Sequence, residues 1–298
     1  MTFKVLVFNE PGICPDSIDG LKRDLHLFLS PNYEIGDVDQ AQLRFGKWVH
    51  TCALLVLPHY SDIEAYTCLG QDLEATKQIC DFVHNGGSFL GIGLGAFFAS
   101  AKANWDGRTI WQEPLALWPG TSAGPWSSSG DCYAHEFFLD IDGSPCHCHL
   151  VLKEGGQFEG FEGEQGTYVL ARYNDNESVA AIHYVCVQRN VVLWHARLEC
   201  AVTAQVMKEN GVRDTDEKIE VIHSLPMNRL NIEIYIACRT RPPGIVRTDT
   251  PNSPPPTYEG ELHSATKITF STAFGRSTKS YPTSKCVCQF VGLVYTIR

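Results

Sequence analysis

Long apolar runs and an excess of positive charge are both missing from this 298-residue sequence. No stretch approaches the roughly 20 apolar residues that a transmembrane helix needs, so we expect no membrane span. The net charge of −10 disfavours general binding to nucleic acid or to an anionic membrane surface. The short apolar segment at the N-terminus is followed at once by Asn9, Glu10 and Pro11, which predicts a first buried strand instead of a signal peptide.

A dense cysteine framework is also missing, because 12 cysteines are spread over the whole chain. Without a secretory signal they are expected to be reduced thiols in a cytoplasmic protein. The segment Cys146-His147-Cys148-His149 invites a zinc interpretation, but alternating residues of a strand point to opposite faces. We therefore predict no metal site, and we expect no cofactor.

Short apolar runs at residues 4–8, 52–57 and 88–92 are typical of strands. The run at 52–57 is apolar on both faces, as in the interior of a parallel sheet. Residues 16–28 and 71–84 have helical periodicity. In the second helix we expect the core-facing residues to be Leu73, Ile79, Cys80, Phe82 and Val83, and another helix is predicted over 95–101. This alternation predicts an α/β fold with a doubly wound, mostly parallel sheet.

The second half has a different pattern, with strand-like segments at 136–142, 148–152, 167–172, 179–187 and 190–194. We place the end of the main domain at residue 202 and predict a helical extension over 203–240. Residues 241–298 form a predicted irregular tail, because its first part is rich in Pro, Thr and Ser, a composition that buries too little surface to offset ordering entropy.

The turn Gly91-Ile92-Gly93-Leu94-Gly95 connects the strand at 88–92 to the next helix. Ligands of parallel α/β sheets bind beyond the carboxyl ends of the strands, so this turn is the first candidate for a site. Flanking glycines are typical of a nucleophile elbow, whose central residue adopts strained backbone geometry. The central residue here is Gly93, which has no side chain to act as a nucleophile.

Two other interpretations of the turn stay open at the level of these residues. The glycines can simply permit a tight connection between strand and helix. They also partly match a dinucleotide-binding loop, although the third glycine comes one residue early and the turn does not follow the first strand.

The residues around this turn closely resemble the N-terminal domain of eukaryotic, fungal-type biotin–protein ligases. That family's pattern is roughly Phe-Val-x-x-Gly-Gly-x-Tyr-Leu-Gly-Ile-Cys-Ala-Gly-Ala-Tyr-Tyr-x-Ser, and this chain has a similar run from Phe82 to Ser100. Further similar segments are 30–33, 52–58 and 115–124. The resemblance covers about residues 3–200, in order and with similar spacing.

The resemblance implies a fold of the class I glutamine-amidotransferase (flavodoxin-like) type, whose active members pair the elbow Cys with a His and a Glu. Carried over by position, the Cys becomes Gly93, the His becomes Arg197, and only Glu199 matches. His195 lies two residues before Arg197, a spacing that returns to the same face of a strand. The family's Pro-Gly-Gly loop reads Pro58-His59-Tyr60, and we expect Tyr60 to crowd the approach to an oxyanion.

Two functional hypotheses result from these departures. The first is a non-catalytic amidotransferase-like module that binds a small anionic metabolite or a protein partner. In such a module the absence of the elbow side chain should leave space in the ligand pocket. Residues of three motifs would line this pocket: Gly91, Gly93, Gly95, Pro119, Gly120, Thr121, Arg197 and Glu199. The second is a hydrolase or amidotransferase with a displaced nucleophile, using Cys200 or assisted by His195. No Gly-Arg-Gly-Arg-x-Gly adenylate-binding loop occurs in the sequence, so biotinylation by this chain alone is not expected.

Overall fold

The computed structural model describes residues 3–11, 15–60, 63–126, 132–141, 144–153, 155–161, 165–186 and 189–196, all within a single compact unit of the chain. The predicted helical extension at 203–240 and the predicted tail at 241–298 lie outside these residues. None of the helices in the described part is both long and apolar enough to cross a membrane.

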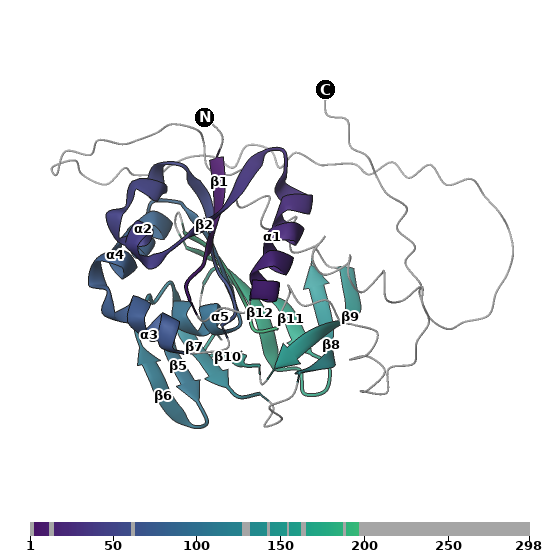
Figure 1. The fold of residues 1–298 in the computed structure, drawn as a ribbon. Helices are drawn as coiled ribbons and strands as arrows, with labels where there is room; N and C mark the ends of the chain where they lie inside the picture. Colours follow the sequence, from purple (N-terminus) through teal and green to yellow (C-terminus); the bar gives the residue numbers. More distant parts are fainter. Residues whose placement is uncertain are drawn as a thin grey trace, which may run out of the picture. The chain divides into compact units, whose positions relative to one another are not determined.

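A mixed sheet forms the centre of the fold (Figure 1). Its strands have the order β2-β1-β3-β4-β13-β12-β10-β7-β5-β6. The first five strands are parallel: β2 (Tyr33–Val38), β1 (Phe3–Phe8), β3 (Cys52–Leu57), β4 (Ser88–Ile92) and β13 (Arg189–Trp194). The next strands are mostly antiparallel to their neighbours: β12 (Val179–Cys186), β10 (Gln157–Glu159), β7 (Trp118–Gly124), β5 (Ser100–Trp105) and β6 (Arg108–Gln112). Only β5 and β7 are parallel within this group.

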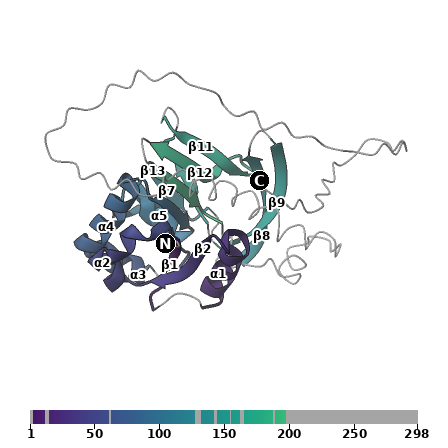
Figure 2. The same cartoon turned by 90° about the horizontal axis from the view of Figure 1, so that it is seen from above.

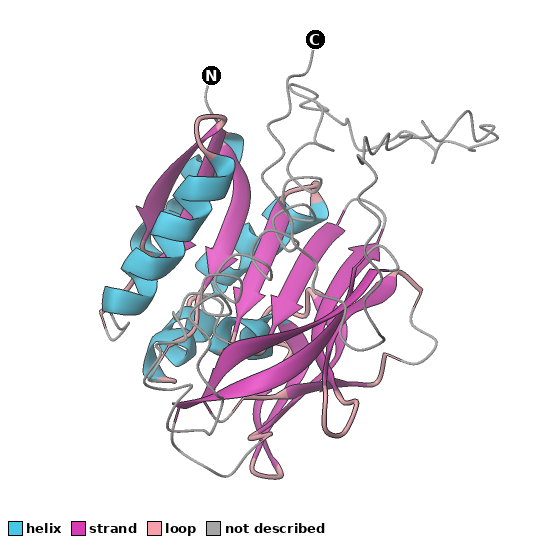
Figure 3. Ribbon diagram, turned by 90° about the vertical axis from the view of Figure 1, so that its right-hand side faces the viewer, coloured by secondary structure: helices cyan, strands magenta, loops and turns pink. Residues whose placement is uncertain are grey.

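Three further strands branch from β12, namely β11 (Thr167–Tyr173), β8 (Cys132–Ile141) and β9 (Ser144–Lys153). All pairs in this branch are antiparallel. The sequence therefore predicted correctly that a parallel α/β first half is followed by a β-rich second half (Figure 3).

Helices cover both faces of the parallel strands, which is the doubly wound arrangement (Figure 2). Helix α1 (Pro15–Leu29) packs on one face, where its Leu21 and Leu25 are fully buried. The opposite face carries the other helices: α2 (Gln40–Phe45), η1 (Lys47–His50), α3 (Glu64–Gln71), α4 (Leu73–His84) and α5 (Leu94–Ala99). Every residue of β3 is buried, as its apolar sequence predicted.

Two details of the predicted helices were wrong. Leu73 is 79% exposed instead of facing the core, because it shares the solvent-facing side of α4 with Lys77, four residues later. The helix predicted over 95–101 ends at Ala99, since Ser100 is extended (φ −78°, ψ 153°) and begins β5. The Ser100 hydroxyl group contacts both the Ala96 carbonyl oxygen (2.9 Å) and the Ser122 hydroxyl group (2.7 Å), which fixes this transition.

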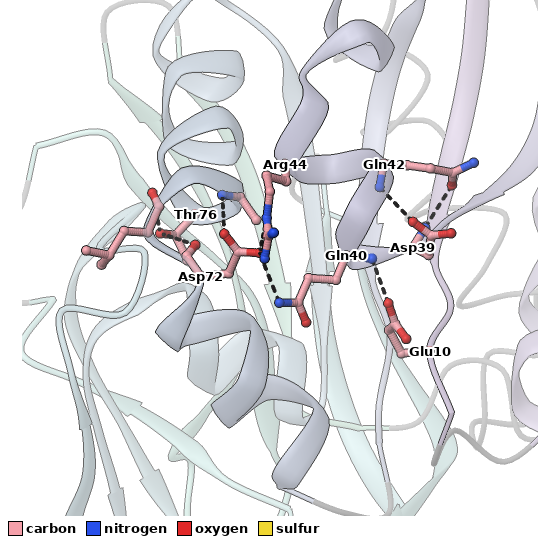
Figure 4. Close-up of polar contacts among 9 residues, drawn as sticks. Glu10, Asp39, Gln40, Gln42, Arg44, Asp72 and Thr76 are labelled. Carbon is pink, nitrogen blue, oxygen red and sulfur yellow. Dashed lines mark hydrogen bonds and ion pairs between the residues drawn. The ribbon is translucent and has the colours of Figure 1, made fainter.

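A buried carboxylate joins α2 to the start of α4 (Figure 4). Asp72 accepts hydrogen bonds from Arg44 Nε (2.8 Å), from Arg44 Nη2 (2.6 Å) and from Gln40 Nε2 (3.0 Å). It also caps α4 by accepting from the Ala75 amide (3.2 Å). The hydrogen bond with Arg44 is the main reason why the pKa of Asp72 is lowered from 3.8 to about 2.

Replacing Asp72 with Asn should lower the free energy of unfolding by about 1–3 kcal/mol at neutral pH, because both the helix cap and the ion pair weaken. The contribution of the carboxylate is present above its unfolded pKa and is lost as the pH falls from 3.8 towards about 2. Urea denaturation of the variant and the parent protein at neutral and acidic pH measures both effects.

Asp81→Asn is the matched control, since Asp81 forms an exposed ion pair with Lys77 one turn earlier on the same helix. Its cost should stay below about 0.5 kcal/mol. Equal costs for the two variants would contradict the role of Asp72.

Candidate functional site

The strand-to-helix turn after β4 has the backbone geometry of an elbow. Gly93 has φ 52° and ψ −115° and directly precedes α5. Its amide donates a hydrogen bond to the Trp194 carbonyl oxygen (2.7 Å), and its carbonyl oxygen accepts one from the Ala96 amide (3.0 Å). Residues with side chains rarely adopt such a positive φ, so the conformation itself favours glycine.

Gly95 is required for a different reason, namely the close approach of α5 to β3. A Cβ atom at residue 95 would overlap the Leu57 carbonyl oxygen and lie 2.8 Å from the Leu57 carbonyl carbon. These atoms belong to the backbone of a central strand and have little freedom to move. The glycine spacing therefore serves the packing of helix against sheet, as the tight-turn interpretation proposed.

His59 occupies the space in which a side chain of residue 93 would begin. A Cβ atom built on Gly93 would overlap His59 Nδ1 and lie 2.9 Å from Cγ and 3.0 Å from Cβ of the same imidazole side chain. His59 follows β3, the neighbour of β4 in the sheet. The expectation that loss of the elbow side chain leaves space was therefore wrong, because the imidazole fills this volume.

Tyr60 does not crowd the elbow, contrary to the expectation from the sequence. It is 2% exposed and packs edge-to-face on Tyr66, with ring centroids 4.9 Å apart. Its hydroxyl oxygen accepts a hydrogen bond from the Glu10 amide (3.1 Å), and burial raises its pKa. Tyr60 is thus a core residue, and the side chain that approaches Gly93 is the preceding His59.

His195 comes directly after β13, which is the neighbour of β4 in the sheet. Because Trp194 of β13 pairs with Ile92 of β4, His195 lies level with the elbow that follows Ile92. Its ring is 2% exposed and is stacked on Phe158 (centroids 4.1 Å apart), with Phe97 of α5 at 4.7 Å. Among the described residues neither ring nitrogen has a hydrogen-bond partner. Burial lowers the pKa of His195 from 6.5 to about 3. The imidazole is therefore neutral at physiological pH and is a weak base in an apolar setting.

The other predicted site residues lie partly inside and partly outside the described part of the chain. Pro119, Gly120 and Thr121 lie in β7, which three strands (β13, β12 and β10) separate from β4. The residues Arg197, Glu199 and Cys200 lie outside the described residues. Their place in a pocket stays a prediction.

The sequence predicted that the segment from Cys146 to His149 holds no metal ion, and this segment lies in β9. Its side chains are not among those that the structure describes. Across the described residues, no group of three or more His, Cys, Asp or Glu side chains lies close enough to hold a metal ion.

His59 is the residue that analysis of the sequence missed. The signal was present in two places, because the resemblance sets His59 against a glycine of the family's loop and Gly93 against the family's cysteine. The structure brings the two positions together, because the imidazole occupies the volume in which a side chain of residue 93 would begin. The two positions are 34 residues apart in sequence, so only the pairing of β3 with β4 makes the relation visible.

The fold and the elbow together define a glutamine amidotransferase-like α/β domain. The structure resembles the glutaminase domain of Trypanosoma brucei CTPS with bound acivicin, at a TM-score of 0.50 and 10% identity, over 81% of this chain and 95% of that one. A glutamine amidotransferase from Thermotoga maritima aligns at a TM-score of 0.49 and 15% identity, over 80% of this chain and 99% of that one.

Within this class, the chain belongs to the biotin–protein ligase N-terminal family, whose model matches residues 3–233. It is 30% identical over 233 residues to the biotin–protein ligase of Schizosaccharomyces pombe. The aligned region covers 73% of this chain but only 36% of the ligase. An uncharacterized protein of Chlamydia muridarum is 29% identical over 187 residues, which is 58% of this chain and 70% of that protein. The chain thus spans about a third of the length of the ligase that it matches.

Gly93→Ala should be more destabilising than a positive φ alone explains. The backbone conformation costs of order 1–3 kcal/mol, and the overlap with His59 adds to it. Gly160→Ala is the matched control, because Gly160 has φ 76° but nothing within 4 Å of the point that a Cβ atom would take. The additional cost should disappear when both alanine variants are compared in a His59→Ala background. Chemical denaturation of the four variants gives this comparison, and an additional cost that persists without His59 would contradict the packing described above.

His195→Leu should reduce the loss of stability at mildly acidic pH. The native pKa of about 3 lies below the ordinary value of 6.5, so the unfolded chain binds a proton at His195 that the native state does not bind. The free energy of unfolding therefore falls as the pH decreases through this window. Between about pH 7.5 and about pH 5 the parent protein should lose about 2 kcal/mol more than the variant.

His26→Leu is the control for this measurement, because His26 lies exposed on α1. A His195→Leu variant with the same pH dependence as the parent protein would contradict the neutral, buried imidazole.

Proposed function

We propose that this domain is a non-catalytic member of the amidotransferase-like class that acts by binding a protein partner in the cytoplasm. The observation that carries the proposal is the imidazole of His59 in the volume of the elbow side chain. Active amidotransferases need a nucleophile at this point, and Gly93 supplies none.

The surroundings of the elbow support the same conclusion. A general base should have a pKa near the working pH, whereas the pKa of His195 is lowered to about 3. Its ring is held between Phe97 and Phe158 and is not exposed to solvent. A base in this setting accepts a proton from a nucleophile only at a large energetic cost.

A protein partner is favoured over a small metabolite because His59 occupies the point at Gly93 where space for a metabolite was expected to open. The family relationship adds to this preference, since the matching part of the Schizosaccharomyces pombe relative is contained within a longer biotin–protein ligase. A domain that has lost its own chemistry can persist by binding another domain. A small anionic ligand at Arg197 and Glu199 is the other form of the proposal.

The purified chain should release no ammonia from glutamine and should not be labelled by a thiol-directed glutamine analogue at a rate above that of its denatured form. An active glutamine amidotransferase serves as the positive control. Turnover that disappears in a Cys200→Ser variant would contradict the proposal and would support a displaced nucleophile. A thermal shift with a panel of carboxylate metabolites, absent in Arg197→Ala, would favour the metabolite over the protein partner.

A further inference from the structure

Strands β8 and β9 form a hairpin and lie side by side in Figure 1. Their antiparallel pairing runs without interruption from the pair Cys132–Lys153 to the pair Ile141–Ser144. Alternate residues of a strand belong to opposite faces, and two residues that pair directly belong to the same face. The register therefore assigns each residue of the hairpin to one of two faces.

One of these faces continues the hydrophobic core. Leu152 of β9 is fully buried in the cluster that also contains Tyr173 of β11. Leu152 pairs with Tyr133 of β8, and Tyr173 pairs with Phe137 of β8. The even-numbered residues of β9 and the odd-numbered residues of β8 therefore share the core face of the hairpin.

The opposite face, which we call the outer face, includes a charged residue of the next strand. Arg172 of β11 pairs with Phe138 of β8 and so belongs to the outer face. The hydrogen bond that Arg172 Nη1 donates to the Glu177 carbonyl oxygen (2.8 Å) is exposed. Solvent therefore reaches the outer face at this point.

Two histidines and a glutamate occupy neighbouring positions on the outer face. His147 and His149 are two residues apart on β9, which is about 6–7 Å along a strand. Glu136 of β8 pairs directly with His149, and the Cβ atoms of directly opposite residues are roughly 4.5–5.5 Å apart. His147 pairs with Phe138, two positions after Glu136, so Glu136 is also its diagonal neighbour. The backbone register thus gathers three residues of metal-binding type in one small part of the sheet.

This register changes the conclusion that the sequence alone favoured. Cys146, His147, Cys148 and His149 alternate between the two faces, so the four cannot bind one ion together. The histidines do not need the cysteines, however, because the pairing with β8 supplies Glu136 on their own face.

We propose that Glu136, His147 and His149 bind one Zn²⁺ ion on the outer face of the β8–β9 hairpin. Two imidazoles and a glutamate are a known ligand set for zinc, in which water takes the fourth position. Imidazole nitrogen and carboxylate oxygen both bind Zn²⁺ at about 2.0–2.2 Å. Three strands (β13, β12 and β11) separate β8 from the strand that precedes the elbow, so the proposal does not depend on whether the elbow is catalytic.

Isothermal titration calorimetry of the full chain with Zn²⁺ tests the proposal. The parent protein should bind one ion that Glu136→Gln, His147→Ala and His149→Ala each bind at least about tenfold more weakly, because even substitutions beside the ligands cost about 10–100-fold in affinity. His135→Ala is the matched control and should leave the affinity unchanged, since His135 pairs with Leu150 on the core face of the same hairpin. Circular dichroism verifies that each variant is folded.

The test must also separate this site from thiolate binding, because the chain contains 12 cysteines. Replacing both Cys146 and Cys148 with Ser should leave the affinity unchanged, and Co²⁺ bound in place of Zn²⁺ should show no thiolate charge-transfer absorption. Three results would each overturn the proposal: a parent protein that binds no Zn²⁺, ligand variants that bind it as tightly as the parent, or a site that disappears with the two cysteines.

Discussion

The contact between His59 and Gly93 is the constraint on which the rest of this site depends. The turn after β4 requires a positive φ at residue 93, and the imidazole that follows β3 takes the volume of any side chain there. A side chain at residue 93 therefore requires the His59 side chain to move. Residues 59 and 93 are thus coupled by packing in this structure, because the imidazole of one stands where a side chain of the other would begin.

The sheet around the elbow is continuous. β3, β4 and β13 are parallel neighbours with continuous pairing, and the Gly93 amide is bonded to the Trp194 carbonyl oxygen. Gly95 still lets α5 approach Leu57 closely. The described residues thus keep the backbone of an amidotransferase-like elbow with a glycine at its centre, and a fold alone does not imply an activity.

Much of the fold could be predicted from the sequence, because the parallel strands are apolar on both faces and the helices between them are amphipathic. β3 and α1 are clear examples. Leu73 was assigned wrongly since the apolar pattern does not say that a residue beside a helix cap points to solvent. The elbow was identified from its glycines, but the role of His59 depends on a contact between two strands that the local sequence does not encode. Tyr60 was misjudged for the same reason, as its ring packs on Tyr66 in the core.

The central claim is most directly tested by nuclear Overhauser effects in isotope-labelled protein. One Hα of Gly93 points to where a Cβ would stand, and that point is 3.0 Å from Cβ of His59. The account predicts strong cross-peaks between this proton and the Hβ protons of His59. If these cross-peaks are missing while those across the β3–β4 pairing are present, the imidazole does not occupy the nucleophile position and the account is wrong.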